Sequence, residues 1–134
     1  MRVIFDTNIW ISFLIGKKLS KLKDLLNNPN IQVWSSAVLE REFLDVAHRS
    51  KIRKYVNEKR INRIHKLMKN CEHCEITKRE IVSVRDIKDL FLLELANEIE
   101  ADFLVTGDND LLCLEQHHKT KIITFETAMA LTVF

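Results

Sequence analysis

The sequence contains few of the residues that interrupt folded chains, with two glycines and one proline among 134 residues. Flexible linkers, collagen-like repeats and disordered chains need many more of these residues, so their scarcity argues against all three. No repeat recurs at the period of a solenoid or a propeller. Apolar residues make up 46% of the chain and charged residues 30%, which suffices for a sizeable core under a hydrated surface. We therefore predict one compact domain spanning residues 1–134.

Long hydrophobic runs and glycine-rich loops are also lacking. The apolar stretch 3–15 is interrupted by Asp6 and Asn8, is too short to span a bilayer, and precedes no small-residue cleavage site. The three cysteines are an odd number, which disfavours a disulfide framework. We therefore expect a cytoplasmic protein with no membrane association. Without a glycine-rich phosphate loop, neither a P-loop nor a dinucleotide-binding fingerprint is available.

Cysteine and histidine offer only weak candidates for chemistry. Cys71 and Cys74 form a plausible zinc half-site, but Cys113 with His117 or His118 supplies no second close pair. Packing as small hydrophobes is the preferred interpretation of the cysteines. All histidines lie outside the acidic motifs described below, so histidine acid–base catalysis has no support; they are His48, His65, His73, His117 and His118.

Charge is unevenly distributed, although the net charge is only +2. Between Arg49 and Lys69, nine basic residues stand against one acid, Glu58, so this segment carries +8 and the remaining chain −6. Such asymmetry is expected of a phosphate-binding rim beside an acidic pocket, although a solvated helical face explains it equally well. The RNA-binding candidates of this segment are Arg60, Arg63 and Lys66.

Hydrophobic periodicity predicts strands that alternate with helices. Strands are expected at 2–6, 31–34, within 75–84, at 103–106 and at 121–125. Helices are expected at 8–15 and 18–27, then to about 48 after a cap at Ser35 or Ser36, and once or twice within 49–69. Two more are expected from 87 to about 100, capped by Asp86, and for a turn or two from 126. This alternation predicts a three-layer α/β/α sandwich with a mainly parallel sheet of about five strands.

Two acids follow predicted strands. Asp6 ends the first strand and Asp108 comes just after the fourth. Ligands of open α/β sheets bind beyond the carboxyl ends of the strands, so both acids reach one rim if the two strands are neighbours. Taken alone, Asp6 is also explained as a helix cap, and Asp108, like Asp110, as a turn former after Gly107.

Two further acids lie on apolar helical stripes. On the third predicted helix Glu42 shares a stripe with Leu39, whereas Glu40 is turned by about 100° and is expected to face solvent. Asp89 shares an apolar line of its own helix, although an acid in a first turn also complements the helix dipole. A carboxylate that faces a core destabilises the fold unless its charge is compensated.

Carboxylates gathered at one rim would raise each other's pKa, and a divalent cation would remove that repulsion. Oxygen ligands favour Mg²⁺ or Mn²⁺ over Zn²⁺. Such an ion activates water and neutralises charge on a phosphodiester. The residues alone therefore predict metal-assisted phosphoryl chemistry.

Four segments resemble the successive motifs of PIN domains: VIFDTNIWIS, SSAVLEREFLDV, RDIKDLFLLELA and ADFLVTGDNDLL. The resemblance extends from Arg2 to about Phe125 and is strongest to prokaryotic toxin components of toxin–antitoxin systems. It implies an acidic, metal-binding quartet, a fifth acid nearby, and two polar residues that order the ligands. The quartet is Asp6, Glu42, Asp89 and Asp108. The fifth acid is Asp110, and the two ordering residues are Asn8 and Thr106.

The same resemblance implies a Mg²⁺- or Mn²⁺-dependent endoribonuclease, a cognate antitoxin protein and a homodimer. An RNA-processing nuclease without a toxin role is one alternative. An RNA- or partner-binding PIN module with little catalysis is another. In the second motif Glu40 competes with Glu42 for the family position, and both spacing from Ser36 and helical phase favour Glu42.

Overall fold

The fold is seen in a computed structural model that describes residues 1–16, 19–75 and 87–132, without the side chains of residues 87–89 and 132. Its helices are α1 (Thr7–Ile15), α2 (Leu19–Asn27), α3 (Ala37–Ala47), α4 (Ser50–Arg53), α5 (Glu58–Lys69), α6 (Ile87–Glu98), α7 (Asn109–Leu112) and α8 (Phe125–Thr132). Its strands are β1 (Arg2–Phe5), β2 (Gln32–Ser35), β3 (Glu72–His73), β4 (Phe103–Val105), β5 (Gln116–His117) and β6 (Thr120–Ile123).

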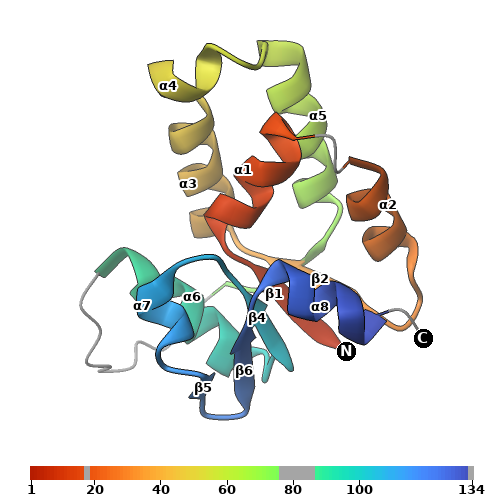
Figure 1. Cartoon of the computed structure of the whole chain (residues 1–134), viewed down its shortest axis with the longest axis vertical. Helices are drawn as coiled ribbons and strands as arrows, with labels where there is room; N and C mark the ends of the chain where they lie inside the picture. The colour runs from red at the N-terminus through yellow and green to blue at the C-terminus, as the bar shows by residue number, and fades with distance from the viewer. Residues whose placement is uncertain (17–18, 76–86, 133–134) are drawn as a thin grey trace.

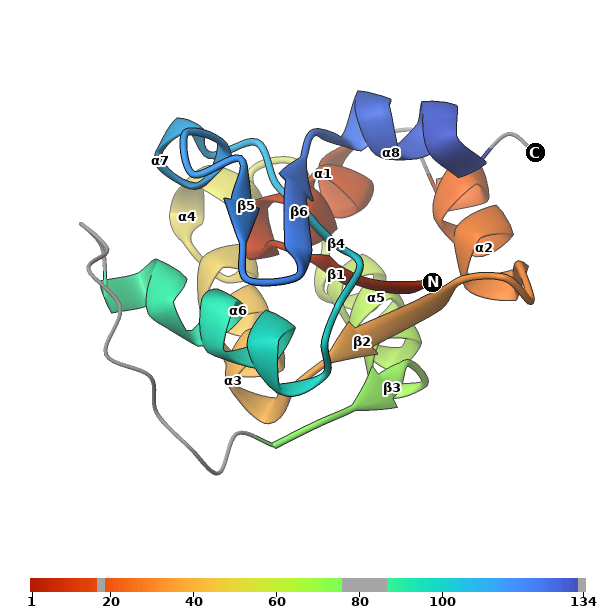
Figure 2. The same ribbon diagram turned by 90° about the horizontal axis from the view of Figure 1, so that it is seen from below.

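The strands form one sheet in the order β3-β2-β1-β4-β6-β5, parallel except between β5 and β6. From β1 the chain moves outward to β2 and β3, then returns to β4 on the other side of β1. Since parallel crossovers are right-handed, this reversal places the two sets of connecting helices on opposite faces. Helices α1, α2, α3 and α5 lie on one side of the sheet and α6 on the other (Figures 1 and 2). The predicted three-layer, mainly parallel sandwich is confirmed.

Aromatic packing fixes α1 and α8 on the sheet. Phe5 of β1 makes edge-to-face contacts with Trp10 and Phe13 of α1, with ring centroids 5.6 and 5.9 Å apart. Phe13 contacts Phe125 at the start of α8 in the same way, at 5.4 Å. Phe5, Trp10 and Phe13 are almost completely buried. This cluster stabilises the segment that follows β1, where the first acid of the candidate site lies.

Local signals predicted several boundaries correctly. Ser36, rather than Ser35, caps α3, because its hydroxyl accepts a hydrogen bond from Leu39 N at 3.1 Å. The basic segment forms two helices, α4 and α5, the second capped by Asn57.

None of the helices in the described ranges has the length and apolar character that a membrane-spanning helix needs.

Two strands differ from the prediction. The third strand is β3, two residues long and located before the predicted 75–84, most of which lies outside the described residues together with Asp86. The sixth strand, β5, was not predicted. It pairs antiparallel with β6 across a turn in which His118 has a φ of 50°. Two-residue strands carry too few side chains for a periodic pattern, so only their pairing identifies them.

Arg60 has a structural role that its position in a basic segment did not reveal. Its guanidinium donates hydrogen bonds to Leu14 O at 2.5 Å and to Gly16 O at 2.9 Å. Both carbonyls lie at the end of α1, where helix carbonyls lack partners within the helix. Arg60 therefore fastens α5 to α1, and it is less available to RNA than the exposed Arg63 and Lys66.

Arg60→Ala should lower the free energy of unfolding by about 1–3 kcal/mol, because it removes two hydrogen bonds from a charged donor. Arg63→Ala is the matched control on the same helix, and its exposed side chain should change stability by less than about 0.5 kcal/mol. Urea denaturation of both variants measures the difference. Equal stabilities would contradict the fastening role of Arg60.

Candidate metal centre

The candidate centre lies where the strand order reverses, between β1 and β4. Ligands of open α/β sheets bind at such a switch point, beyond the carboxyl ends of the strands. The parallel register aligns Phe5 with Val105, so the residues after both strands leave the sheet together. Asp6 N donates a hydrogen bond to Val105 O at 2.9 Å, which continues the pairing by one residue. Asp6 is therefore held beside the β4 terminus.

Thr106 connects the two acids of this rim. Its hydroxyl donates to Asp6 Oδ2 at 2.7 Å and accepts from Asp108 N at 3.0 Å. Thr106 is completely buried, and Asp6 is only 6% exposed. The hydroxyl thus fixes the orientation of the Asp6 carboxylate and ties the Asp108 backbone to it. This contact agrees with the ordering role that the family resemblance implies for Thr106.

Burial raises the pKa of Asp6 above its ordinary value. The hydrogen bond from Thr106 opposes this shift, as do the nearby amides of Thr7 and Asn8, while the charge of Asp108 adds to it. Folding therefore makes ionisation of Asp6 less favourable than that of an exposed carboxyl, and a cation bound beside it would offset this effect. A buried carboxylate beside a second carboxylate is the oxygen donor set that suits a hard divalent ion.

Asp108 caps α7 and still leaves an oxygen for other contacts. Its Oδ1 accepts a hydrogen bond from Asp110 N at 2.9 Å, whereas its Oδ2 has no hydrogen-bond partner among the described residues. Asp108 is half-buried and Asp110 exposed. Asp108, for which the sequence offered a turn-forming role as the alternative, thus caps α7, and this cap remains compatible with a ligand role through Oδ2.

Of the remaining predicted residues, Asn8 reaches this pair through its backbone amide, beside the Asp6 carboxylate, and the described contacts do not establish that Glu42 or Asp89 belongs to the pair. Asn8 is exposed on α1, and Glu42 is half-buried on α3. Asp89 lies in the first turn of α6, but its side chain is outside the described part. Within residues 1–16, 19–75 and 90–131, no three His, Cys, Asp or Glu side chains are grouped closely enough to hold a metal. The full quartet therefore stays a prediction.

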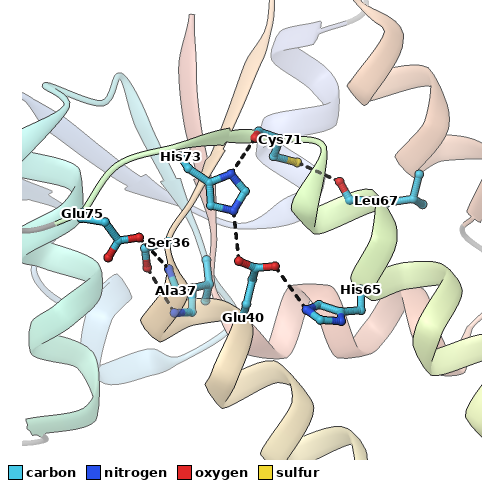
Figure 3. Close-up of polar contacts among 9 residues, drawn as sticks. Ser36, Ala37, Glu40, His65, Leu67, Cys71, His73 and Glu75 are labelled. Atoms are coloured by element: carbon cyan, nitrogen blue, oxygen red, sulfur yellow. Dashed lines mark hydrogen bonds and ion pairs between the residues drawn. The ribbon is translucent and has the colours of Figure 1, made fainter.

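The prediction that Glu40 faces solvent was wrong. Its side chain is only 15% exposed and lies between two histidines, with Oε1 3.2 Å from His65 Nε2 and Oε2 3.0 Å from His73 Nε2 (Figure 3). The His73 contact is also a hydrogen bond, whereas the His65 contact has only the distance of an ion pair. Two histidines outside the acidic motifs therefore do meet an acid of the second motif.

The error has a simple cause. The helical phase of apolar residues predicts which side chains face solvent only when a helix packs against one neighbouring element, and α3 packs against two helices. It packs against both α1 and α5, and the ion pair with His65 shows that Glu40 lies on the face toward α5. Glu40 thereby links α3 to α5 and to β3. Spacing on the helix places Glu42 about 200° from Glu40, on a different side of α3.

The cysteine pair gives no support to a reactive or zinc-binding site. Burial raises the pKa of the Cys71 thiol to about 12, and the charges of Glu40 and Glu72 add to the shift. Burial also raises the pKa of Cys74. Because the thiolate is the nucleophile and the metal ligand, both residues favour the protonated, unreactive form.

A comparison with family models matches residues 2–110 to a model described as PIN domain. This range includes β1 through β4 and both acids of the rim. No curated protein matches the chain.

Asp6→Asn should stabilise the metal-free protein at neutral pH, and the gain should vanish in acid. Since the pKa of Asp6 is raised on folding, the folded state holds its proton more tightly, and wild-type stability falls as pH rises through that pKa. The asparagine side chain does not titrate, so the stability of the variant should not fall with rising pH for this reason. Urea denaturation in a chelator, from about pH 3.5 to 7.5, gives both curves.

Mn²⁺ should reverse the order of the two proteins, because an ion bound to native Asp6 stabilises only the wild type. Parallel stability curves for wild type and Asp6→Asn at every pH would show that the buried carboxylate carries no such penalty.

Proposed function

Because the chain belongs to the PIN-domain family, whose members are generally nucleases that use divalent metal ions, we propose that it is a Mg²⁺- or Mn²⁺-dependent endoribonuclease. The single observation that carries this proposal is the buried Asp6 carboxylate held by Thr106 beside Asp108 at the switch point. The proposed reaction is hydrolysis of a phosphodiester bond in RNA.

Asp6 and Asp108 would hold the ion, with Glu42 and Asp89 as the further ligands that the resemblance implies. When bound, Mg²⁺ or Mn²⁺ lowers the pKa of a coordinated water and neutralises charge on the phosphate. The chain's own residues prepare this chemistry. Thr106 keeps Asp6 in one orientation, and burial leaves little of the Asp6 side chain accessible to water. Preorganised ligands avoid rearrangement during the reaction.

RNA must be held by charge outside an acidic pocket, because carboxylates repel phosphates. Arg63 and Lys66 are exposed on α5 and are the proposed phosphate contacts. Arg60 is better described as a structural residue, for the reasons given with the fold. The proposed RNA-binding surface is therefore formed by Arg63 and Lys66, while Arg60 holds the helix that carries them in place.

The biological role is a finer proposal that rests on the family resemblance. We propose a cytoplasmic toxin, acting as a homodimer and neutralised by a cognate antitoxin. An adjacent small gene for a DNA-binding protein would support it, and a gene neighbourhood without one would favour RNA processing. A PIN module that binds RNA or a partner with little catalysis is the remaining alternative, which the intact set of four acids in the sequence disfavours.

Cleavage of single-stranded RNA should require Mg²⁺ or Mn²⁺ and should fall by at least about 100-fold in Asp6→Asn and in Glu42→Gln. Asp45→Asn is the matched control, because Asp45 is an exposed acid on the same helix as Glu42. Gel analysis of a labelled RNA, with and without excess chelator, measures the rates. Full activity in chelator would contradict the metal mechanism, and loss in Asp45→Asn would indicate a general effect of charge.

Arg63→Ala combined with Lys66→Ala should weaken RNA binding and flatten its dependence on salt. Each lost phosphate contact should change the slope of log affinity against log salt by about 0.7 for a single strand. The measurement is RNA affinity across a salt series in the Asp6→Asn background. Lys23→Ala with Lys21→Ala, two exposed lysines on α2, is the control pair. An unchanged slope would return α5 to a solvated helical face.

A further inference from the structure

The turn between α4 and α5 exposes the only tyrosine of the sequence. Tyr55 is 73% exposed, the largest fraction among the large hydrophobic side chains that the structure describes as exposed. The backbone beneath it is fixed, because Tyr55 N donates to Ile52 O at 3.0 Å and the next residue, Val56, is buried in the core. The ring is therefore presented to solvent from an anchored turn.

Cations accompany this ring along the chain. Three exposed basic residues precede it within five positions, namely Lys51, Arg53 and Lys54. Among the described residues, no side-chain hydrogen bond or ion pair involves Lys51 or Lys54. Their charges are therefore available to an anion that approaches Tyr55.

The one acid of this basic segment is already engaged. Glu58 Oε1 lies 2.8 Å from His48 Nε2, and Glu58 Oε2 lies 3.4 Å from Arg53 Nη1. The hydrogen bond to Glu58 raises the pKa of His48 and lowers that of Glu58, which favours the charged pair. Repulsion of phosphates by Glu58 is thereby reduced.

An exposed aromatic ring among free cations has the chemistry of a single-strand platform. Every nucleobase offers a π face to such a ring, and neighbouring lysines and arginines hold the backbone. A protein partner would instead be indicated by a contiguous apolar surface around the ring. Here the flanking residues Lys54 and Asn57 are exposed and polar, so the surroundings favour nucleic acid.

We infer that Tyr55 stacks on an unpaired base of the RNA substrate, with Lys51 and Lys54 on the adjacent phosphates; this rests on the proposed function. A base inside a duplex cannot present its face to the ring, so the contact selects single-stranded RNA. The site is a binding site and takes no part in the chemistry.

The position of Tyr55 indicates how far it acts from the scissile bond. Helix α3 starts next to the end of β2 and has 11 residues, so it rises about 16 Å to the tip that carries α4 (Figure 1). A stacked strand covers about 3.4 Å per nucleotide, so on the order of five nucleotides connect the two places. Loss of Tyr55 should therefore raise KM and leave kcat unchanged.

The test measures binding of a single-stranded oligoadenylate of about 12 nucleotides to the full chain in the Asp6→Asn background. Tyr55→Ala and Tyr55→Leu should weaken binding by about 5- to 100-fold, whereas Tyr55→Phe should stay within about twofold, because only an aromatic ring stacks. An abasic strand of equal length should bind all four proteins alike. A duplex of the same length should also show no dependence on Tyr55.

Equal affinity of wild-type Tyr55 and Tyr55→Ala for oligoadenylate would overturn the inference, as would an equal loss with the duplex. A Tyr55 effect seen with polyglutamate and not with oligoadenylate would indicate an acidic protein partner and would also overturn it. The proposed function fails separately: if the chain with Asp6 intact cleaves no RNA in Mn²⁺ while the Tyr55 dependence persists, binding stands and the nuclease activity does not.

Discussion

Asp6 is a carboxylate that the fold removes from water at the end of its central strand, and the arrangement of the candidate centre depends on this placement. Burial disfavours its ionised form, and only part of that penalty is offset by the hydroxyl of Thr106. The parallel pairing of β1 with β4 brings Thr106 and Asp108 to the same rim. A shift of one residue in that register would turn Thr106 to the other face and leave Asp6 without its donor.

The proposed function divides the charges of the molecule between two places. Two carboxylates, Asp6 and Asp108, lie at the switch point, and cations lie on α4 and α5 at the far end of α3. Helix α3 is held at its start by the Ser36 cap and along its side by Glu40 between two histidines. Its rigidity matters because it would set the separation between the bond to be cleaved and the surface that holds the strand.

The architecture was predictable because its signals are local. Apolar runs, the cap at Ser36 and the alternation of strands and helices sufficed for a three-layer sandwich with a parallel sheet. What failed depends on tertiary partners. The helical phase of α3 could not reveal that α5 covers Glu40. The basic composition of residues 49–69 could not reveal that Arg60 donates hydrogen bonds to the carbonyls at the end of α1. Part of the candidate site was also predictable. The ends of the first and fourth predicted strands indicated that Asp6 and Asp108 lie close together, whereas the placement of Glu42 and Asp89 beside them stays a prediction.

A crystal structure grown with Mn²⁺ and measured at an X-ray energy that gives manganese an anomalous signal tests the central claim most directly. We expect an anomalous peak about 2–2.4 Å from carboxylate oxygens of both Asp6 and Asp108, with Glu42 and Asp89 turned toward it directly or through water. Bound Mn²⁺ located elsewhere, with the Asp6 carboxylate held by Thr106 alone, would contradict it.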